Sequence, residues 1–245
     1  MSVHILSMSC AGIPGTGKST LLSRFEQDGM LQRHFNDAGC DDVRVIFVHE
    51  PMEQWGDLLE RFYTNRDMYA GCFQFNAFVT HVDAVEAAVN AAKADGTNKT
   101  VLLLTERSMY DQRLFWTLQV EDQLTTADAS HDMVYQKVWA RWRQLIPELS
   151  HVFYLRNADI ADTMARVQER ARAEEANGLT LDYQQRLLAL HDDWYTEPRA
   201  RPPGAPTDGI PCTQLDADPD FRSDDGELRA LAARVLQAVM LYKIV

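Results

Sequence analysis

The stretch "GIPGTGKST", Gly12 to Thr20, largely decides how this chain folds. It fits the pattern GxxxxGKS and follows the apolar run "VHILSMSCA". Gly12, Gly15 and Gly17 let the backbone turn sharply, so that successive N–H groups point at phosphate oxygens. The helix that we expect to begin at Lys18 adds its dipole to the attraction for anions. This order of strand, loop and helix predicts a loop that binds nucleotide phosphates.

The side chains of this loop have separate expected roles. Lys18 would neutralise the β- and γ-phosphates, and the Ser19 hydroxyl would bind Mg²⁺. Thr16 and Thr20 belong to the same nucleotide-binding stretch. The loop alone does not tell where the phosphate goes. A switch-type GTPase is disfavoured, because "NKTV" at Asn98 lacks the Asp of the guanine-reading NKxD motif and precedes its strand.

The order of strands and helices predicts the fold class. Helical patterns at 18–27, 75–94, 132–146, 160–175, 181–195 and 224–242 alternate with short, apolar, β-branched segments. Most of these short segments lack strict alternation, as expected for strands buried on both faces. We therefore expect an α/β fold of the P-loop NTPase-like kind, a doubly wound five-stranded parallel sheet flanked by helices. The expected strands are "VHILSM" from Val3, "VRVIFV" from Val43, "TVLLLT" from Thr100, "HVFYL" from His151 and "CTQLDA" from Cys212.

Length and composition limit the remaining classes. A chain of 245 residues without a composition break is expected to form one domain, residues 1–245. A formal net charge of −12 disfavours a nucleic acid polymer as partner. Four scattered cysteines indicate reduced thiols, and no apolar run reaches the ~18 residues that a membrane span needs. No signal or transit peptide is evident, so a cytoplasmic protein is expected.

The carboxyl ends of the second and third expected strands carry ionisable side chains. The second strand runs into "HEPMEQW" with Glu50, and the third into "TERSMYDQR" with Glu106 and Arg107. In a doubly wound sheet, ligands bind beyond these strand ends. Phosphoryl transfer to a hydroxyl needs a base, a metal-side carboxylate and a cation, and Glu50, Glu106 and Arg107 are suited to these roles in that order. From spacing alone, each of them is equally a strand-end charge that faces water.

Several motifs occur in an order that resembles the deoxyribonucleoside kinase family, which contains deoxycytidine, deoxyguanosine and mitochondrial thymidine kinases and the insect multisubstrate enzyme. The motifs run from the first strand nearly to the C-terminus. The resemblance implies transfer of the ATP γ-phosphate to the 5′-hydroxyl of a deoxynucleoside, with Glu50 as general base. It implies that Arg107 holds the 5′-oxygen and the incoming phosphoryl group, and that Glu106 is on the metal side. The motifs are "GIPGTGKST", "EPMEQW", "FQFNAF", "ERSMYDQR", "RVQERARAEE", "YQQRLLALHDDW" and "LDADPDF".

The arginine-rich segment matches the lid of this family, at about residues 166–178. Taken by itself, the segment "MARVQERARAEE" is typical of a solvent-exposed helix with Arg–Glu pairs. The resemblance implies that Arg170 and Arg172 clamp the transferring phosphate and that Arg166 lies near the phosphates or adenine. A Pro- and Gly-rich loop at about 197–211 leads into the last strand.

Three further contacts with the substrates follow from the resemblance. Glu175 matches the lid glutamate that binds the sugar 3′-hydroxyl, together with Tyr63. Phe221, in "DADPDF", lies where relatives pack against the ATP adenine, although a core Phe before the last helix fits equally well.

The resemblance also implies a pocket for the base around "CFQFNAF". Gln74 takes the base-reading position, where its amide offers a donor and an acceptor side by side. Phe73 and Trp55 would line this pocket with aromatic faces. The spacing of the phenylalanines in this segment also suits a helix core.

Four positions bear on which base is preferred. Trp116 stands where relatives stack a Phe on the base, and Gln112 where the deoxycytidine kinase type has an Asp. Ala77 and His81 are at positions that set pocket size and polarity in relatives. We expect a preference for pyrimidine deoxynucleosides with some breadth.

Two other functions remain open from the sequence. A nucleoside monophosphate kinase of the thymidylate type shares the fold plan and lid, but "EPMEQW" places a carboxylate where a monophosphate would be repelled. A catalytically silent nucleotide-binding subunit is the other, and Lys18, Glu50 and Arg107 argue against it. The family usually forms homodimers, so a homodimer is expected, with the helical segments at 75–94 and 134–146 as candidate faces.

Overall fold

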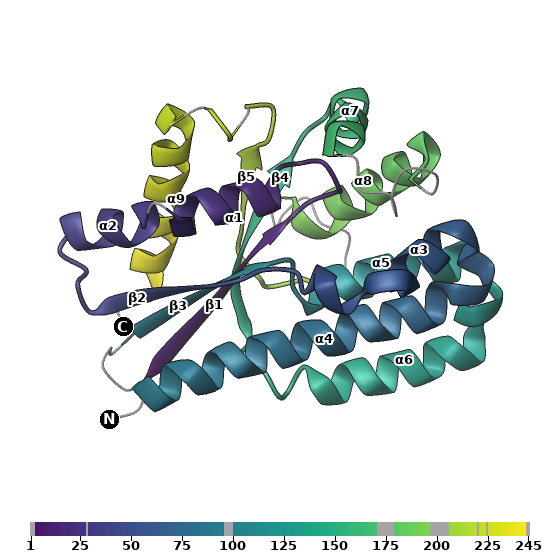
Figure 1. Cartoon of the computed structure of the whole chain (residues 1–245). Coiled ribbons are helices and arrows are strands. Elements are labelled where there is room, and N and C mark those ends of the chain that lie inside the picture. The colour runs from purple at the N-terminus through teal and green to yellow at the C-terminus, as the bar shows by residue number, and fades with distance from the viewer. Residues whose placement is uncertain are drawn as a thin grey trace.

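Across the residues that the computed structural model describes, five parallel strands form one sheet in the order β2-β3-β1-β4-β5 (Figure 1). The strands are β1 (His4–Ala11), β2 (Val43–Val48), β3 (Thr100–Glu106), β4 (Leu149–Arg156) and β5 (Cys212–Asp216). The expected parallel sheet is thus confirmed. The residues described are 3–27, 29–95, 100–170, 179–196, 206–219, 221–223 and 225–243.

Helices cover both faces of this sheet (Figure 1). They are α1 (Lys18–Gln27), α2 (Met30–Asp37), α3 (Gly56–Thr64), α4 (Arg66–Asp95), α5 (Met109–Glu121), α6 (Ala129–Trp142), α7 (Ile160–Arg170), α8 (Leu181–Tyr195) and α9 (Asp225–Lys243). Short 3₁₀ turns lie at Met52–Gln54 and Thr125–Ala127.

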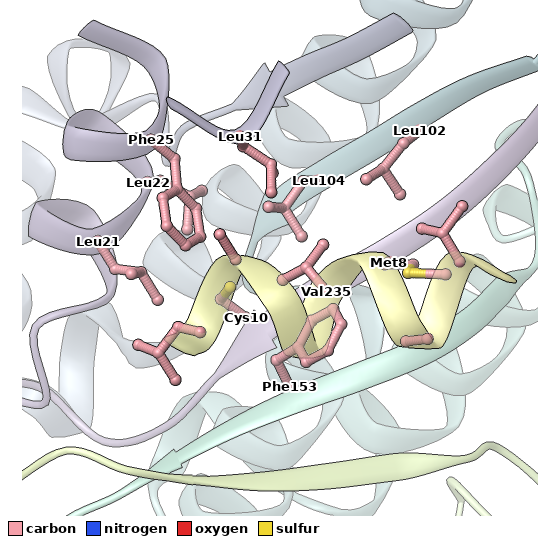
Figure 2. Close-up of a cluster of buried hydrophobic side chains, with 14 of the residues drawn as sticks. Met8, Cys10, Leu21, Leu22, Phe25, Leu31, Leu102, Leu104, Phe153 and Val235 are labelled. Carbon is pink, nitrogen blue, oxygen red and sulfur yellow. The ribbon is translucent and has the colours of Figure 1, made fainter. Parts of the chain in front are cut away.

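One core layer lies between the sheet and α1, α2 and α9 (Figure 2). Alternate residues of β1, Leu6, Met8 and Cys10, contribute to it, and Val235 of α9 packs among them. On the other face, Leu103 of β3 packs with α4, while β4 packs with α5 and α8. Burial on both faces explains the near-continuous apolar strands of the sequence.

Helices α2, α3 and α5 were not predicted from the sequence, and α4 begins nine residues earlier than the pattern indicated. The buried side chains of α5 include Met109, Leu114, Trp116 and Leu118, which lie on several sides of the helix. A helix buried on several sides has no single apolar stripe, so its period does not stand out. No helix in the described part of the chain is both long and apolar enough to cross a bilayer.

The order of the strands in the sheet determines where a ligand-binding crevice can lie. The chain leaves β1 toward β2 and β3 on one side, then crosses to β4 and β5 on the other. Such a switch point opens a crevice at the carboxyl ends of the strands. The loop after β1 and the ends of β2 and β3 therefore meet there.

Candidate active site

A cavity of about 770 Å³ extends from the phosphate loop to helices α4 and α5. This volume is within the range of ligand-binding pockets. Its lining is charged near the loop and aromatic or amide-bearing farther in. The lining residues include Gly15, Gly17, Lys18, Ser19, Thr20, Glu50, Trp55, Phe62, Tyr63, Phe73, Gln74, Ala77, Glu106, Arg107, Gln112, Phe115, Gln119, Arg166, Arg170, Tyr183 and Phe221.

The phosphate loop has room only for glycine at its tightest points. Gly15 has a φ of +90°, and a Cβ placed there would lie 2.3 Å from the carbonyl oxygen of Thr163. Gly17 has a φ of +85°, and its Cβ would lie 2.9 Å from the ring of Phe221. Both the left-handed backbone and the close neighbours exclude larger residues. Phe221 therefore packs directly against the loop.

Lys18 is 4% exposed and folds back over the loop. Its Nζ donates to the carbonyl oxygen of Ile13 at 2.8 Å and to Thr16 Oγ1 at 3.4 Å. Burial and the nearby charge of Arg107 lower the pKa of Lys18 to about 7. An anion bound in the loop would favour the charged form of this amine.

Ser19 and Glu106 bring two oxygen ligands together beside the loop. Ser19 Oγ donates to Glu106 Oε1 at 2.5 Å. Burial alone would raise the pKa of Glu106, but His49, Lys18 and Ser19 outweigh it and lower the pKa to about 2. The carboxylate is therefore ionised at neutral pH.

His49 supports this carboxylate from the end of β2. Its Nε2 lies 2.8 Å from Glu26 Oε2 and its Nδ1 lies 3.9 Å from Glu106 Oε2. Interactions with these two carboxylates, of which Glu106 is the stronger, raise the pKa of His49 to about 8.

This donor set fits Mg²⁺. Within the described ranges, no group of three or more His, Cys, Asp or Glu side chains is placed to hold a metal ion. Mg²⁺ usually binds one or two carboxylates and completes its octahedron with water and substrate phosphates, so one carboxylate and one hydroxyl next to the phosphate loop suffice.

Arg107 and Glu50 form a buried ion pair between the loop and the inner pocket. Arg107 Nε lies 2.7 Å from Glu50 Oε1, and the two side chains are 6% and 13% exposed. Arg107 Nη1 also donates to the carbonyl oxygen of Gly12 at 2.8 Å. Burial raises the pKa of Glu50, and the charge of Arg107 opposes this rise. The net result is a pKa above the usual value for a glutamate.

The backbone of Arg107 is left-handed, with a φ of +62°. This conformation is uncommon for residues other than glycine and persists where its surroundings hold it. Arg107 N donates to the carbonyl oxygen of Cys10 at 2.9 Å, and Thr105 Oγ1 donates to the carbonyl oxygen of Arg107 at 2.6 Å. Both bonds tie the residue to the sheet.

A capping box follows directly at the start of α5. Ser108 N and Oγ donate to Asp111 Oδ2 at 2.8 and 2.7 Å, and Ser108 Oγ accepts from Tyr110 N at 3.2 Å. These bonds fix the entry of the helix. Asp111 Oδ1 also lies 3.8 Å from Nε2 of His191, and both side chains are fully buried. Burial, and then the charge of Arg107, lower the pKa of His191, which is therefore neutral.

Aromatic side chains form one wall of the inner pocket. Trp55 and Phe73 meet edge to face at 5.5 Å between centroids, and Phe62 stacks on Phe73 at 4.8 Å. Trp55 Nε1 donates to Thr80 Oγ1 at 3.0 Å, which fixes the indole. Phe115 also lines the cavity, and Arg107 Cζ lies over its ring, 4.8 Å from the ring centre.

Two residues expected in the base pocket lie elsewhere. Trp116 is fully buried, stacks on Tyr135 at 4.3 Å and donates from Nε1 to Asp132 Oδ1 at 2.7 Å. Phe115 lines the cavity instead. An α-helix turns about 100° per residue, so a one-residue difference changes the face on which a side chain lies.

His81 is also outside this cavity. It lines a separate space of about 40 Å³ with Trp139 and Arg143. Burial, with a smaller effect of Arg107, lowers the pKa of His81 to about 4, so the ring is neutral.

The structure describes part of the segment that is expected to form the lid. Arg166 and Arg170 line the cavity, and Arg166 donates to the carbonyl oxygens of Ala217 and Asp218 at 2.7 and 2.6 Å. Arg172 and Glu175 lie outside the described residues, as do most of the lid and the first part of the Pro- and Gly-rich loop.

The other expected residues divide between the lining and the support of the loop. Thr20, Tyr63 and Ala77 line the cavity. Gly12 and Thr16 lie behind it: Gly12 accepts from Arg107, and the buried Thr16 donates from Oγ1 to the carbonyl oxygen of Ile13 at 3.0 Å.

The sequence did not indicate Phe115, Gln119 or Tyr183 as lining residues. Phe115 and Gln119 follow Gln112 at three and seven residues, the spacing of one helical face. That signal was present in the sequence, but it becomes useful only once α5 is known to be a helix against the pocket.

Comparison with known proteins finds a matching family and similar proteins. The family model for Deoxynucleoside kinase matches residues 8–240. Deoxycytidine kinase 2 of Gallus gallus is 26% identical, and the match covers 90% of this chain and 85% of that protein. Deoxycytidine kinase 1 of Xenopus laevis is also 26% identical, with 93% and 88% covered.

Proposed function

Because the chain belongs to the deoxynucleoside kinase family and is a phosphotransferase of that kind, we propose that it transfers the γ-phosphate of ATP to the 5′-hydroxyl of deoxyribonucleosides. One observation carries the proposal. A single cavity contains the phosphate loop, the Glu50–Arg107 pair and a neutral pocket of aromatic rings and amides. A phosphate donor and an uncharged nucleoside fit its two ends.

Glu50 is proposed as the general base. Its carboxylate takes the proton of the 5′-hydroxyl as the oxygen attacks the γ-phosphorus, and the bond to the ADP leaving group breaks. Burial raises the pKa of Glu50 and so increases its affinity for that proton. Arg107, held by Gly12 and Glu50, stays charged beside the reacting oxygens.

The phosphate end is proposed to use the loop amides, Lys18 and the lid arginines Arg166 and Arg170. Backbone N–H groups and the positive end of α1 attract the phosphates. Ser19 and Glu106 would hold Mg²⁺, which supplies charge neutralisation to the donor phosphates. Phe221, which packs against Gly17, is proposed to cover the adenine.

The base end is proposed to prefer pyrimidines with some breadth. Trp55 and Phe73 offer aromatic faces, Gln74 offers hydrogen bonds, and Ala77 leaves space. Tyr63, with Glu175 of the lid, is proposed to bind the sugar 3′-hydroxyl.

A homodimer is proposed through α6. Met133 and Val134 of this helix are 53% and 47% exposed. Adjacent exposed apolar side chains of this size favour a protein contact. Light scattering after size exclusion would measure twice the mass of one chain, 27.9 kDa, if this is right.

The test is a coupled ATP-turnover assay with Mg²⁺ against thymidine, deoxycytidine, deoxyadenosine and deoxyguanosine, with dTMP and no acceptor as controls. We expect turnover with at least one pyrimidine nucleoside. Turnover with dTMP alone would instead identify a monophosphate kinase. Tight binding of ATP and nucleoside without turnover would identify a silent subunit.

A further inference from the structure

Asp111, in the first turn of α5, carries a fully buried carboxyl group that the proposed reaction does not use. Its Oδ2 accepts from Ser108 N and Oγ at 2.8 and 2.7 Å. Its Oδ1 is buried as well and has no hydrogen-bond partner in the part of the chain that the structure describes. A buried oxygen without a partner is rare in folded proteins and calls for an explanation.

The ring that faces this oxygen makes the arrangement unfavourable. His191 Nε2 lies 3.8 Å from Asp111 Oδ1, and both side chains are fully buried. His191 Nδ1 lies 2.7 Å from the carbonyl oxygen of Leu187, which can only accept, so Nδ1 carries the one hydrogen of this neutral ring. A ring carbon in that place would be too close, because C–H···O contacts are about 3.3 Å or longer, so the ring is not turned over. Nε2 is therefore an acceptor, and two acceptors face each other.

Arg107 provides the positive charge that acts on Asp111. Burial raises the pKa of Asp111, and the charge of Arg107 is the largest of the influences that oppose this rise. The hydrogen bonds from Ser108 and the hydroxyl of Tyr195 oppose it less strongly. The ionised form of Asp111 thus depends mainly on Arg107.

Arg107 depends on Asp111 in return. Burial acts to lower the pKa of Arg107, but the charges of three carboxylates outweigh this effect and raise it. Those carboxylates are Glu50, Asp111 and Glu106. Asp111 also holds the backbone, because Ser108 is the next residue after Arg107, whose left-handed φ is +62°.

From this geometry we infer that Asp111 is a positioning residue, whose buried charge keeps Arg107 in place while Glu50 takes up the proton of the acceptor hydroxyl. The inference rests on the proposed function, in which Glu50 is the general base. Arg107 Nε lies 2.7 Å from Glu50 Oε1, and this ion pair is lost when the carboxylate becomes protonated. Asp111 takes no part in the proton transfer, so its charge stays constant. A hydrogen bond to Oδ1 would weaken the effect of that charge on Arg107, which explains an oxygen without a donor.

Asp111→Asn separates the charge of this side chain from its shape. The amide oxygen still accepts from Ser108 N and Oγ, and the amide nitrogen then faces His191 Nε2 and donates to it. We expect a Tm equal to or above that of the wild type, because Glu50 still pairs with Arg107 in the resting enzyme. We expect kcat to fall about tenfold, while the dissociation constant for nucleoside stays within about threefold.

The pH profile gives a readout that a merely structural role would not change. Burial raises the pKa of Glu50, and the charge of Arg107 opposes this rise. The charges of Glu106 and Asp111 raise the pKa further, whereas that of Lys18 lowers it. Loss of the Asp111 charge therefore lowers the pKa of Glu50, and the acid limb of kcat/KM should move to lower pH in Asp111→Asn.

A double variant tests the same pairing without turnover. In Glu50→Gln, Arg107 has already lost the charge of one carboxylate, so Asp111→Asn removes the second of the three. The Tm of the double variant should then fall below the value that the two single changes predict together. Thermal melts of the wild type, the two single variants and the double variant measure this difference.

Asp132→Asn is the matched control. Asp132 of α6 accepts from Trp116 Nε1 at 2.7 Å and does not line the cavity, so kcat and the acid limb should match the wild type. An active Asp111→Asn enzyme with the kcat and acid limb of the wild type would overturn the inference alone, because a neutral side chain would then serve equally well. Additive changes in Tm, or an Asp111→Asn variant that does not fold, would overturn it too. A wild type that phosphorylates none of the nucleosides would overturn the proposed function and this role together.

Discussion

Replacing Glu50 with glutamine separates its role in catalysis from its role in the fold. Glutamine keeps the shape of the side chain and an oxygen that can accept from Arg107 Nε, which now lies 2.7 Å from Glu50 Oε1. It removes the negative charge and the ability to take up a proton. Catalysis and stability should therefore respond very differently.

The expected change in stability is small. Two unit charges about 4 Å apart attract by roughly 4 kcal/mol at an effective dielectric constant near 20. Burial is the stronger influence on the pKa of Glu50 and acts against its charged form. The penalty for burying a carboxylate is itself several kcal/mol, and the charges of Asp111 and Glu106 still act on the buried Arg107, so relief of this penalty offsets most of the lost attraction. We expect a net loss of about 1–2 kcal/mol, or a fall in Tm of roughly 2–8 °C.

The expected change in turnover is large. Loss of a general base typically costs about 10²- to 10⁴-fold, which is roughly 2.7–5.4 kcal/mol of barrier. The dissociation constant for nucleoside should stay within about tenfold of the wild type. Steady-state kcat, calorimetric nucleoside binding and a thermal melt, measured on the same preparation, check all three values.

The pH profile gives an independent check. Because burial raises the pKa of Glu50, its carboxyl group stays protonated to a higher pH than an exposed glutamate does. Wild-type kcat/KM should fall as pH decreases through this raised pKa, and that acid limb should vanish in the variant. Glu53→Gln, at an exposed neighbour, is the control. A Glu50→Gln enzyme with kcat within tenfold of wild type and an unchanged acid limb would refute the assignment.

Three other substitutions, one of them paired with a control at Gly39, test the surroundings of the site. Ser19→Ala removes the hydroxyl that lies beside the Glu106 carboxylate, and so removes one of the two proposed Mg²⁺ ligands. We expect the Mg²⁺ concentration that gives half-maximal turnover to rise about tenfold, as a Mg²⁺ titration would measure. Gly15→Ala should lower the free energy of unfolding by more than the ~1–3 kcal/mol that the left-handed backbone alone costs. The added Cβ would lie 2.3 Å from the carbonyl oxygen of Thr163 in α7, so the loop must shift and ATP binding should weaken. Gly39→Ala, with a similar φ of +73° and nothing within 4 Å, should cost only the strain, as denaturant unfolding would show. Thr105→Val removes the 2.6 Å hydrogen bond from Thr105 Oγ1 to the carbonyl oxygen of Arg107. We expect the free energy of unfolding to fall by about 1–3 kcal/mol and kcat to fall about tenfold. An unchanged kcat would mean that this hydrogen bond does not hold Arg107 in its active position.

The sequence by itself determined the sheet and the phosphate end of the site. All five strands and helices such as α1 and α8 follow from local patterns, because apolar runs and helix periods are properties of neighbouring residues. The phosphate loop is equally local, since nine consecutive residues carry both its glycines and its lysine. Glu50, Glu106 and Arg107 could be placed together because parallel strands end at one edge of a sheet.

Only the tertiary structure decided the inner pocket. Whether Phe115 or Trp116 faces the cavity depends on the rotation of α5, which is buried on several sides and has no single apolar stripe. His81 lies in a different space from Gln74, seven residues away on the same helix, because α4 packs against different neighbours along its length. Hydrogen bonds from Gln74 of α4 to Gln112 of α5, and from Gln119 of α5 to Gln74, join these two helices. Such bonds depend on where the helices lie relative to each other, and that is decided by packing over the whole chain.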